Sequence, residues 1–68
     1  MEEINNIEMA VSRLKDEIQG VMDYERMHSM VSDPELKKIF HNNMEIEKQH
    51  AKVLLNYLSK SIDKVGVK

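Results

Sequence analysis

One short break in an otherwise continuous helical pattern constrains the fold of this chain more than any other feature. The break, Ser32-Asp33-Pro34-Glu35, contains the only proline among 68 residues. Proline disfavours helical geometry at the residue before it and is well tolerated in the first turn of a helix. Two caps fit the start of that helix, either a capping box of Ser32 with Glu35 or an N-cap at Asp33. One helix is therefore predicted to stop here and a second to start.

Apolar residues at steps of three and four predict a long helix on each side of this break. The first helix is expected over about residues 2–31, and the second over about 34–64, after a turn at 32–34. Gly66 is the expected C-terminal stop. A connection this short makes the two helices antiparallel neighbours. The predicted fold class is all-α, with residues 1–68 forming a single domain folded as a two-helix hairpin.

Each predicted helix has a seam along which it is expected to pack. The first helix carries Ile4, Ile7, Val11, Leu14, Ile18 and Val21, with a second strip on the same side made of Ala10, Leu14, Glu17, Val21, Tyr24, His28 and Val31. The second helix carries Leu36, Phe40, Asn43, Glu47, His50, Leu54 and Tyr57, with Ile39, Ile46, Val53 and Leu58 beside them. These faces are expected to be buried.

A single hairpin of this size is expected to bury too little apolar surface to be comfortably stable. The chain contains no cysteine, so neither a disulfide nor a thiolate metal site can stabilise it. Self-association is therefore predicted. Its simplest form is a two-fold homodimer, in which two hairpins make a four-helix bundle.

Composition narrows the classes of partner. The net charge is -2 and the pI is about 5.9, which argues against nucleic acid because phosphate binding needs a basic face. No apolar run approaches the roughly 20 residues that span a bilayer. The N-terminal Met1-Glu2-Glu3 is acidic where a signal peptide would be basic. A cytoplasmic protein without a membrane or nucleic-acid partner is expected.

Three ionisable residues interrupt the predicted seams. Glu47 and His50 are three residues apart, so their side chains project from the same face of the second helix. Glu17 lies nearly as far before the bend as these two lie after it, which places all three within roughly 5 Å of one height. Buried ionised carboxylates require compensation. The sequence therefore predicts a metal site made of Glu17, Glu47 and His50.

A homodimer would double this ligand set to four glutamates and two histidines. Four carboxylates balance the charge of two divalent ions, so a centre with two metals per dimer is expected. Carboxylates and imidazoles without sulfur suit iron or manganese, and zinc also accepts this ligand set.

In these features the chain resembles the encapsulated ferritins, half-length ferritin-like proteins that complete a di-iron ferroxidase centre across a subunit interface. The similarity spans about residues 16–57 and rests on Asp16-Glu17-Ile18, Val21, Tyr24, the Ser-x-Pro turn at Ser32 and Pro34, and Glu47-x-x-His50. The resemblance implies a ferritin-like four-helix bundle with iron as its cofactor, two ions per dimer, and Glu17, Glu47 and His50 as ligands. It implies oxidation of Fe(II) to Fe(III) by oxygen or peroxide, for iron storage or detoxification.

The resemblance also implies roles for neighbouring residues and partners. Asp16 would match an acidic residue near the path by which iron reaches the site. Tyr24 is expected to be a core tyrosine whose hydroxyl has a partner, with a role beside the metal ligands as the alternative. Gln19 and Asp23 depart from the family pattern along that path. Family members assemble as homodimers within a larger ring such as a decamer, and they are cargo of encapsulin shells. Residues 63–68 match the docking extension of that family only weakly.

Two alternatives remain open at this stage. The first is a non-catalytic helical oligomerisation module, in which the three residues form a core ion pair or hold a structural divalent ion. The second is a di-manganese or zinc protein with the same ligands. A further Glu-x-x-His, Glu25 with His28, lies level with His41 nearer the turn, but no carboxylate of the second helix completes a site at that height. The methionines, Met9, Met22, Met27, Met30 and Met44, are expected to pack at subunit contacts.

Overall fold

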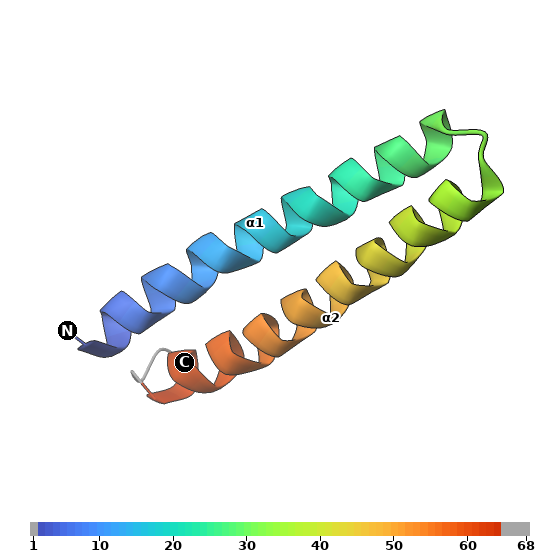
Figure 1. The fold of residues 1–68 in the computed structure, drawn as a ribbon. Coiled ribbons are helices and arrows are strands. Elements are labelled where there is room, and N and C mark those ends of the chain that lie inside the picture. The colour runs from blue at the N-terminus through green and yellow to red at the C-terminus, as the bar shows by residue number, and fades with distance from the viewer. Residues whose placement is uncertain (1, 65–68) are drawn as a thin grey trace.

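The structure, a computed structural model, describes residues 2–64 as two long α-helices joined by a short turn (Figure 1). Helix α1 spans Glu2–Met30 and helix α2 spans Pro34–Lys64. The helices run antiparallel, and the start of α1 lies beside the end of α2 (Figure 1). The predicted all-α hairpin is confirmed, although α1 ends one residue earlier than expected. Gly66 lies outside the described residues.

The turn is held by a cap at Asp33. Its Oδ2 atom accepts a hydrogen bond from the backbone N–H of Leu36 at 2.8 Å, and its carbonyl accepts one from Lys37 N–H at 3.0 Å. Pro34, the first helical residue, has no N–H that would need a partner. Of the two caps that the sequence allows, the structure therefore uses the N-cap at Asp33.

A lysine closes the other side of the turn. The Nζ atom of Lys37 donates a hydrogen bond to the carbonyl of His28 at 2.9 Å, and Val31 N–H donates to Met27 C=O at 3.2 Å. Carbonyls in the last turn of a helix lack partners within the helix, so both contacts stabilise the end of α1. The Lys37 contact also joins the two helices directly.

The seam of α1 follows the second of the two strips expected from the sequence. Ala10 and Glu17 are buried on it, and Leu14, Val21 and Tyr24 are half-buried. Half of the other series lies outside the contact, since three of its six members are exposed at intervals of seven residues: Ile4, Val11 and Ile18. The hairpin alone therefore leaves apolar surface on α1 uncovered.

The seam of α2 differs from the predicted one beyond its midpoint. Ala51 is half-buried and Leu58 is buried against α1, whereas His50 and Tyr57 are exposed in the hairpin. Strict alternation of three and four residues averages 3.5 residues per turn, but an α-helix has 3.6, so the contact line drifts along a straight helix. His50 and Tyr57 consequently lie at the edge of the contact. The expectation that they are buried does not hold for one hairpin.

Neither helix within residues 2–64 has a stretch apolar enough to cross a membrane. Exposed apolar side chains are instead distributed along α2 as a stripe that also includes His50. We call this the His50 stripe, and it consists of Ile39, Ile46, His50, Val53 and Tyr57. Contiguous exposed apolar surface of this kind is typical of protein interfaces.

Candidate metal centre

The three residues singled out by the sequence meet halfway along the hairpin. Glu17 comes from the middle of α1, and Glu47 and His50 come from one turn in the middle of α2. Each offers one ligand atom, and these three atoms all lie within 4.8 Å of one another. In the part of the chain that the structure describes, no other group of three such side chains is brought together in this way. The site is thus the one expected from counting residues on either side of the turn.

Burial decreases steadily across this cluster. The Glu17 side chain is only 3% exposed and lies between the helices, Glu47 is half-buried, and the His50 side chain is 57% exposed. Gly20 contributes to this arrangement, because a Cβ atom there would approach the carboxyl carbon of Glu47 to 3.1 Å. The carboxylates of the cluster therefore lie between the helices, and its side at His50 is open to solvent.

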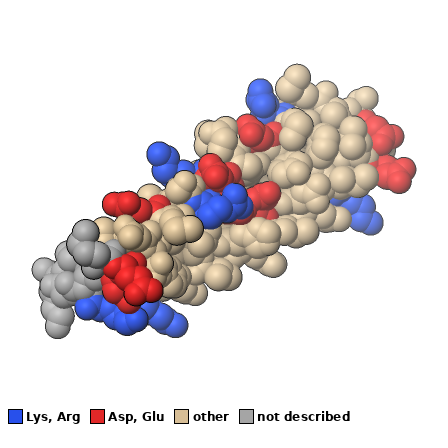
Figure 2. Space-filling model, turned by 60° about the vertical axis from the view of Figure 1, so that its left-hand side comes forward, with Lys and Arg blue, Asp and Glu red and all other residues tan. Residues whose placement is uncertain are grey.

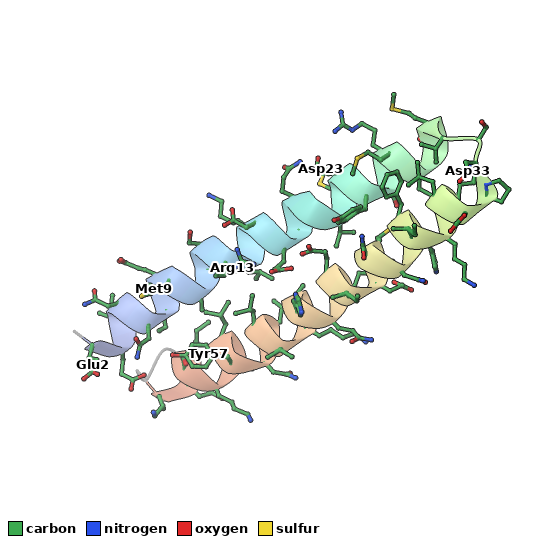
Figure 3. The ribbon with its side chains drawn as sticks, in the orientation of Figure 1. Glu2, Met9, Arg13, Asp23, Asp33 and Tyr57 are labelled. Atoms are coloured by element: carbon green, nitrogen blue, oxygen red, sulfur yellow. The ribbon has the colours of Figure 1, made fainter. Side chains whose placement is uncertain are left out.

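Both oxygens of the buried Glu17 carboxylate have partners. Its Oε2 atom lies 3.3 Å from Nδ1 of His50, and its Oε1 atom accepts a hydrogen bond from Nη2 of Arg13, one turn earlier on α1. The Nη1 atom of Arg13 also lies 3.6 Å from Oδ2 of Asp16. Figure 3 labels Arg13 near the middle of the hairpin, and Figure 2 shows acidic and basic side chains side by side at mid-length. Sequence reasoning missed Arg13, whose only signal is its spacing of four residues from Glu17.

At pH values between the lowered pKa of Glu17 and the raised pKa of Glu47, the two carboxyl groups share one proton. Hydrogen bonding with Glu47 is the largest influence that lowers the pKa of Glu17, followed by contacts with His50 and Arg13, while burial opposes the change. The same hydrogen bond, with burial and the charge of Glu17, raises the pKa of Glu47. Two carboxylates this close repel each other when both are ionised, so additional positive charge beside them favours the ionised form of both. A divalent ion would supply that charge.

The donor set fits such an ion. Carboxylate oxygens with one imidazole nitrogen suit iron, manganese or zinc, and ligands become available when the shared proton leaves. The three side chains would supply ligands from one side of such an ion. The opposite side of the cluster, at the exposed His50, is open to further ligands.

The other candidate residues lie apart from this cluster. Asp16 precedes Glu17, but its side chain is 67% exposed and pairs with Arg13 outside the helix contact. Tyr24 packs on Phe40, with ring centroids 6.0 Å apart, nearer the turn. The structure gives no contact between either residue and the three clustered side chains.

The second Glu-x-x-His is only partly assembled. The rings of His28 and His41 lie beside each other across the hairpin, tilted by 57° with centroids 6.3 Å apart, and Glu25 is exposed. Within residues 2–64, no third side chain joins these two histidines in a metal-ligating group. The pair therefore resembles an ordinary contact near the turn more than a second site.

Comparison with known proteins places this geometry in a family. A search of the curated proteins and a search of the solved structures each found no match. The EncFtn-like family matches residues 1–67, which is nearly the whole chain and includes all three clustered residues. The encapsulated-ferritin resemblance noted from the sequence is thereby confirmed, and the chain belongs to the EncFtn-like family.

Proposed function

We propose that two copies of this hairpin form a di-iron centre that oxidises Fe(II) to Fe(III), with Glu17, Glu47 and His50 of each copy as ligands. The observation that carries this proposal is the approach of one ligand atom from each residue to within 4.8 Å of the others. Membership of the EncFtn-like family supports it, since that family suggests ferritin-like di-iron proteins.

The His50 stripe supports a dimer that closes over the site. Ile46 precedes His50 by four residues and Val53 follows it by three, so all three project from one face of α2. Ile46 is 49% exposed and Val53 is 67% exposed, although both are apolar. A two-fold contact along this stripe would bury them and bring the open sides of two clusters together. Six ligands would then surround two ions.

The residues of the chain would act by binding and charge compensation. Bound iron supplies the redox chemistry, in which each Fe(II) gives one electron to dioxygen or peroxide and becomes Fe(III). Glu47 gives up the shared proton when the ion binds, and His50 must be neutral to act as a ligand. The buried Glu17 holds negative charge in a site of low dielectric, where it favours the more highly charged product. Four carboxylates of the dimer balance two divalent ions.

A role in iron storage or detoxification follows from the same proposal. The family suggests cargo of encapsulin shells in the cytoplasm and assembly beyond a dimer, in a ring such as a decamer. Residues 63–68, which match the docking extension of that family only weakly, lie mostly outside the described residues.

Native mass spectrometry before and after anaerobic addition of Fe(II) tests the proposal. We expect two iron atoms per pair of chains and stronger assembly in the presence of the metal. His50→Ala should lose iron uptake and oxidation while remaining helical. His41→Ala is the matched control, because His41 is an exposed histidine of the same helix outside the cluster, and it should behave as the unmodified chain does. Oligomers that take up no iron would refute the di-iron centre.

A structural zinc or manganese site is the second candidate, because the same donor set accepts those ions. It predicts tight binding of the metal and metal-dependent assembly without oxygen consumption on addition of Fe(II). An oxygen electrode distinguishes the two functions directly.

A further inference from the structure

Within residues 2–64, Arg13 is the one lysine or arginine whose side chain contacts the clustered carboxylates. Its Nη2 atom donates to Oε1 of Glu17, the most buried carboxylate of the cluster. The guanidinium thereby balances the negative charge of this carboxylate. A metal ion that binds Glu17 therefore meets a cation that is already paired with one of its two oxygens.

We propose that Arg13 is a displaceable counter-ion, which competes with divalent cations for Glu17 and so limits how tightly the site holds its metal. The inference rests on the proposed function, because it assumes that Glu17 is a metal ligand. It goes beyond that function by assigning control of metal affinity to a residue that is not itself a ligand. Arginine suits the role because it stays charged at every relevant pH and has no acceptor or free lone pair with which to bind a metal.

The surroundings of Arg13 allow it to leave Glu17 at small cost. Its side chain is 61% exposed, so it can move without disturbing the helix contact. Asp16, which is also exposed, already lies 3.6 Å from the Nη1 atom of Arg13. When a metal takes Glu17, the guanidinium can remain paired with Asp16 outside the cluster. Arg13 thus has Glu17 as its partner in the metal-free state and Asp16 as its partner in the metal-bound state.

Competition of this kind suits a site whose metal is a substrate. A carboxylate set with no competing cation would hold its ions strongly. A guanidinium on the same helix instead balances the negative charge of Glu17 as each ion departs. Asp16 then has a different part from the one expected of it by resemblance. Its carboxylate holds the displaced arginine, and its own charge is largely balanced by that partner.

Zinc binding to the assembled protein tests the inference, because Zn²⁺ has no redox chemistry and its affinity is separate from ferroxidase activity. Isothermal titration at low salt should show that Arg13→Gln binds Zn²⁺ about tenfold more tightly than the unmodified chain, the size expected for a partly exposed charged hydrogen bond. The metal-free variant should unfold at a lower temperature, because Glu17 loses its counter-ion. Affinity that is unchanged or weaker would overturn the inference.

Arg26→Gln is the matched control. Arg26 lies on the same helix, is 68% exposed and pairs with Asp23 at 3.6 Å, but it makes no contact with the cluster. Its replacement should leave Zn²⁺ affinity unchanged. If neither the unmodified chain nor Arg13→Gln binds Zn²⁺, the metal centre itself is rejected. Equal binding in the two rejects only the role of Arg13.

A double-mutant cycle with Asp16 separates competition from simple attraction of cations. Asp16→Asn removes the alternative partner of Arg13, so in a chain that retains Arg13 it should weaken Zn²⁺ binding severalfold. In the Arg13→Gln background the same change should have little effect, because no arginine remains to be relocated. Equal weakening in both backgrounds would show that Asp16 acts on the metal directly, and would overturn the exchange between the two carboxylates.

Discussion

Polar groups at the turn and polar groups in the middle of the hairpin have different kinds of partner. At the turn, the Asp33 carboxylate accepts from Leu36 N–H, and Lys37 donates to the carbonyl of His28. In the middle, Glu17 and Glu47 are paired only through a shared proton and the exposed side chains of Arg13 and His50. At the turn, the hydrogen-bonding groups find their partners within one chain. In the middle, the charge of the carboxylates is balanced by a proton and by exposed side chains, which a metal ion could replace.

This difference predicts that stability and metal binding can be separated by position. Changes at the turn should lower the free energy of unfolding without altering metal affinity in the folded protein. Replacement of Glu47 in the middle should do the reverse and lower metal affinity without lowering the free energy of unfolding, because the carboxyl group of Glu47 lies close to that of Glu17 and the two repel each other when ionised. The predictions below test this separation.

The largest effect is expected from Glu47→Gln. The amide keeps the shape of the side chain and can donate to Glu17 as the shared proton does, but it is a much poorer metal ligand. Iron or zinc affinity should fall by more than about 100-fold, since loss even of a residue that only supports a ligand costs about 10- to 100-fold. The thermal unfolding temperature of the metal-free protein at neutral pH should be unchanged or higher. A large loss of stability would contradict the separation.

At the turn, Asp33→Ala should have the opposite profile. Loss of the hydrogen bond to Leu36 N–H removes the N-cap of α2, which should lower the free energy of unfolding by about 1 kcal/mol. Urea denaturation of the metal-free protein measures this, and zinc titration of the folded variant should show normal affinity. Ser32→Ala is the control, because the observed cap uses Asp33, and its effect should be much smaller. Equal losses would revive the capping box of Ser32 with Glu35.

The pH dependence of stability sharpens the comparison further. The pKa of Glu47 is raised above its ordinary value of 4.5, so its stabilising contribution is complete below that value and is lost as the pH rises through the raised pKa. Glu17 has a lowered pKa, so its contribution is present above 4.5 and is lost only when the pH falls through the lowered value. In metal-free protein, the free energy of unfolding of Glu47→Gln should therefore increase relative to that of the unmodified chain from about pH 4.5 upward. Urea denaturation at a series of pH values measures this difference. A difference in free energy of unfolding that stays constant across the range would contradict the shared proton.

Much of this arrangement could be predicted from the sequence. Pro34 located the turn, and the similar distances of Glu17 and Glu47 from it along the chain predicted that they would meet. These inferences depend only on the rise of a helix, which varies little. The exposure of His50 was not predictable from a three-and-four pattern, because the line of contact depends on how two particular helices drift around each other.

The contributions of Arg13 and Gly20 were harder to foresee for a different reason. An arginine four residues before a glutamate is common on solvated helix faces, and its value here depends on the burial of Glu17, which only packing determines. From the sequence alone, Gly20 only weakens the first helix, by roughly 1 kcal/mol relative to alanine. The structure supplies a reason for it, since the Glu47 carboxyl group occupies the space beside it.

Gly20→Ala should have the smallest effect and is the most informative about the middle of the hairpin. Alanine raises helix propensity by up to about 1 kcal/mol. Its Cβ would lie 3.1 Å from Cδ and 3.2 Å from Oε2 of Glu47, so this carboxyl group must shift by a few tenths of an ångström. We expect zinc affinity to fall about threefold while the metal-free protein is slightly stabilised. Ser12→Ala, at an exposed position of α1, gains helix propensity without touching Glu47 and should leave zinc affinity unaltered. If Gly20→Ala instead binds zinc normally, Glu47 has room to move, and the space beside Gly20 is not what positions it.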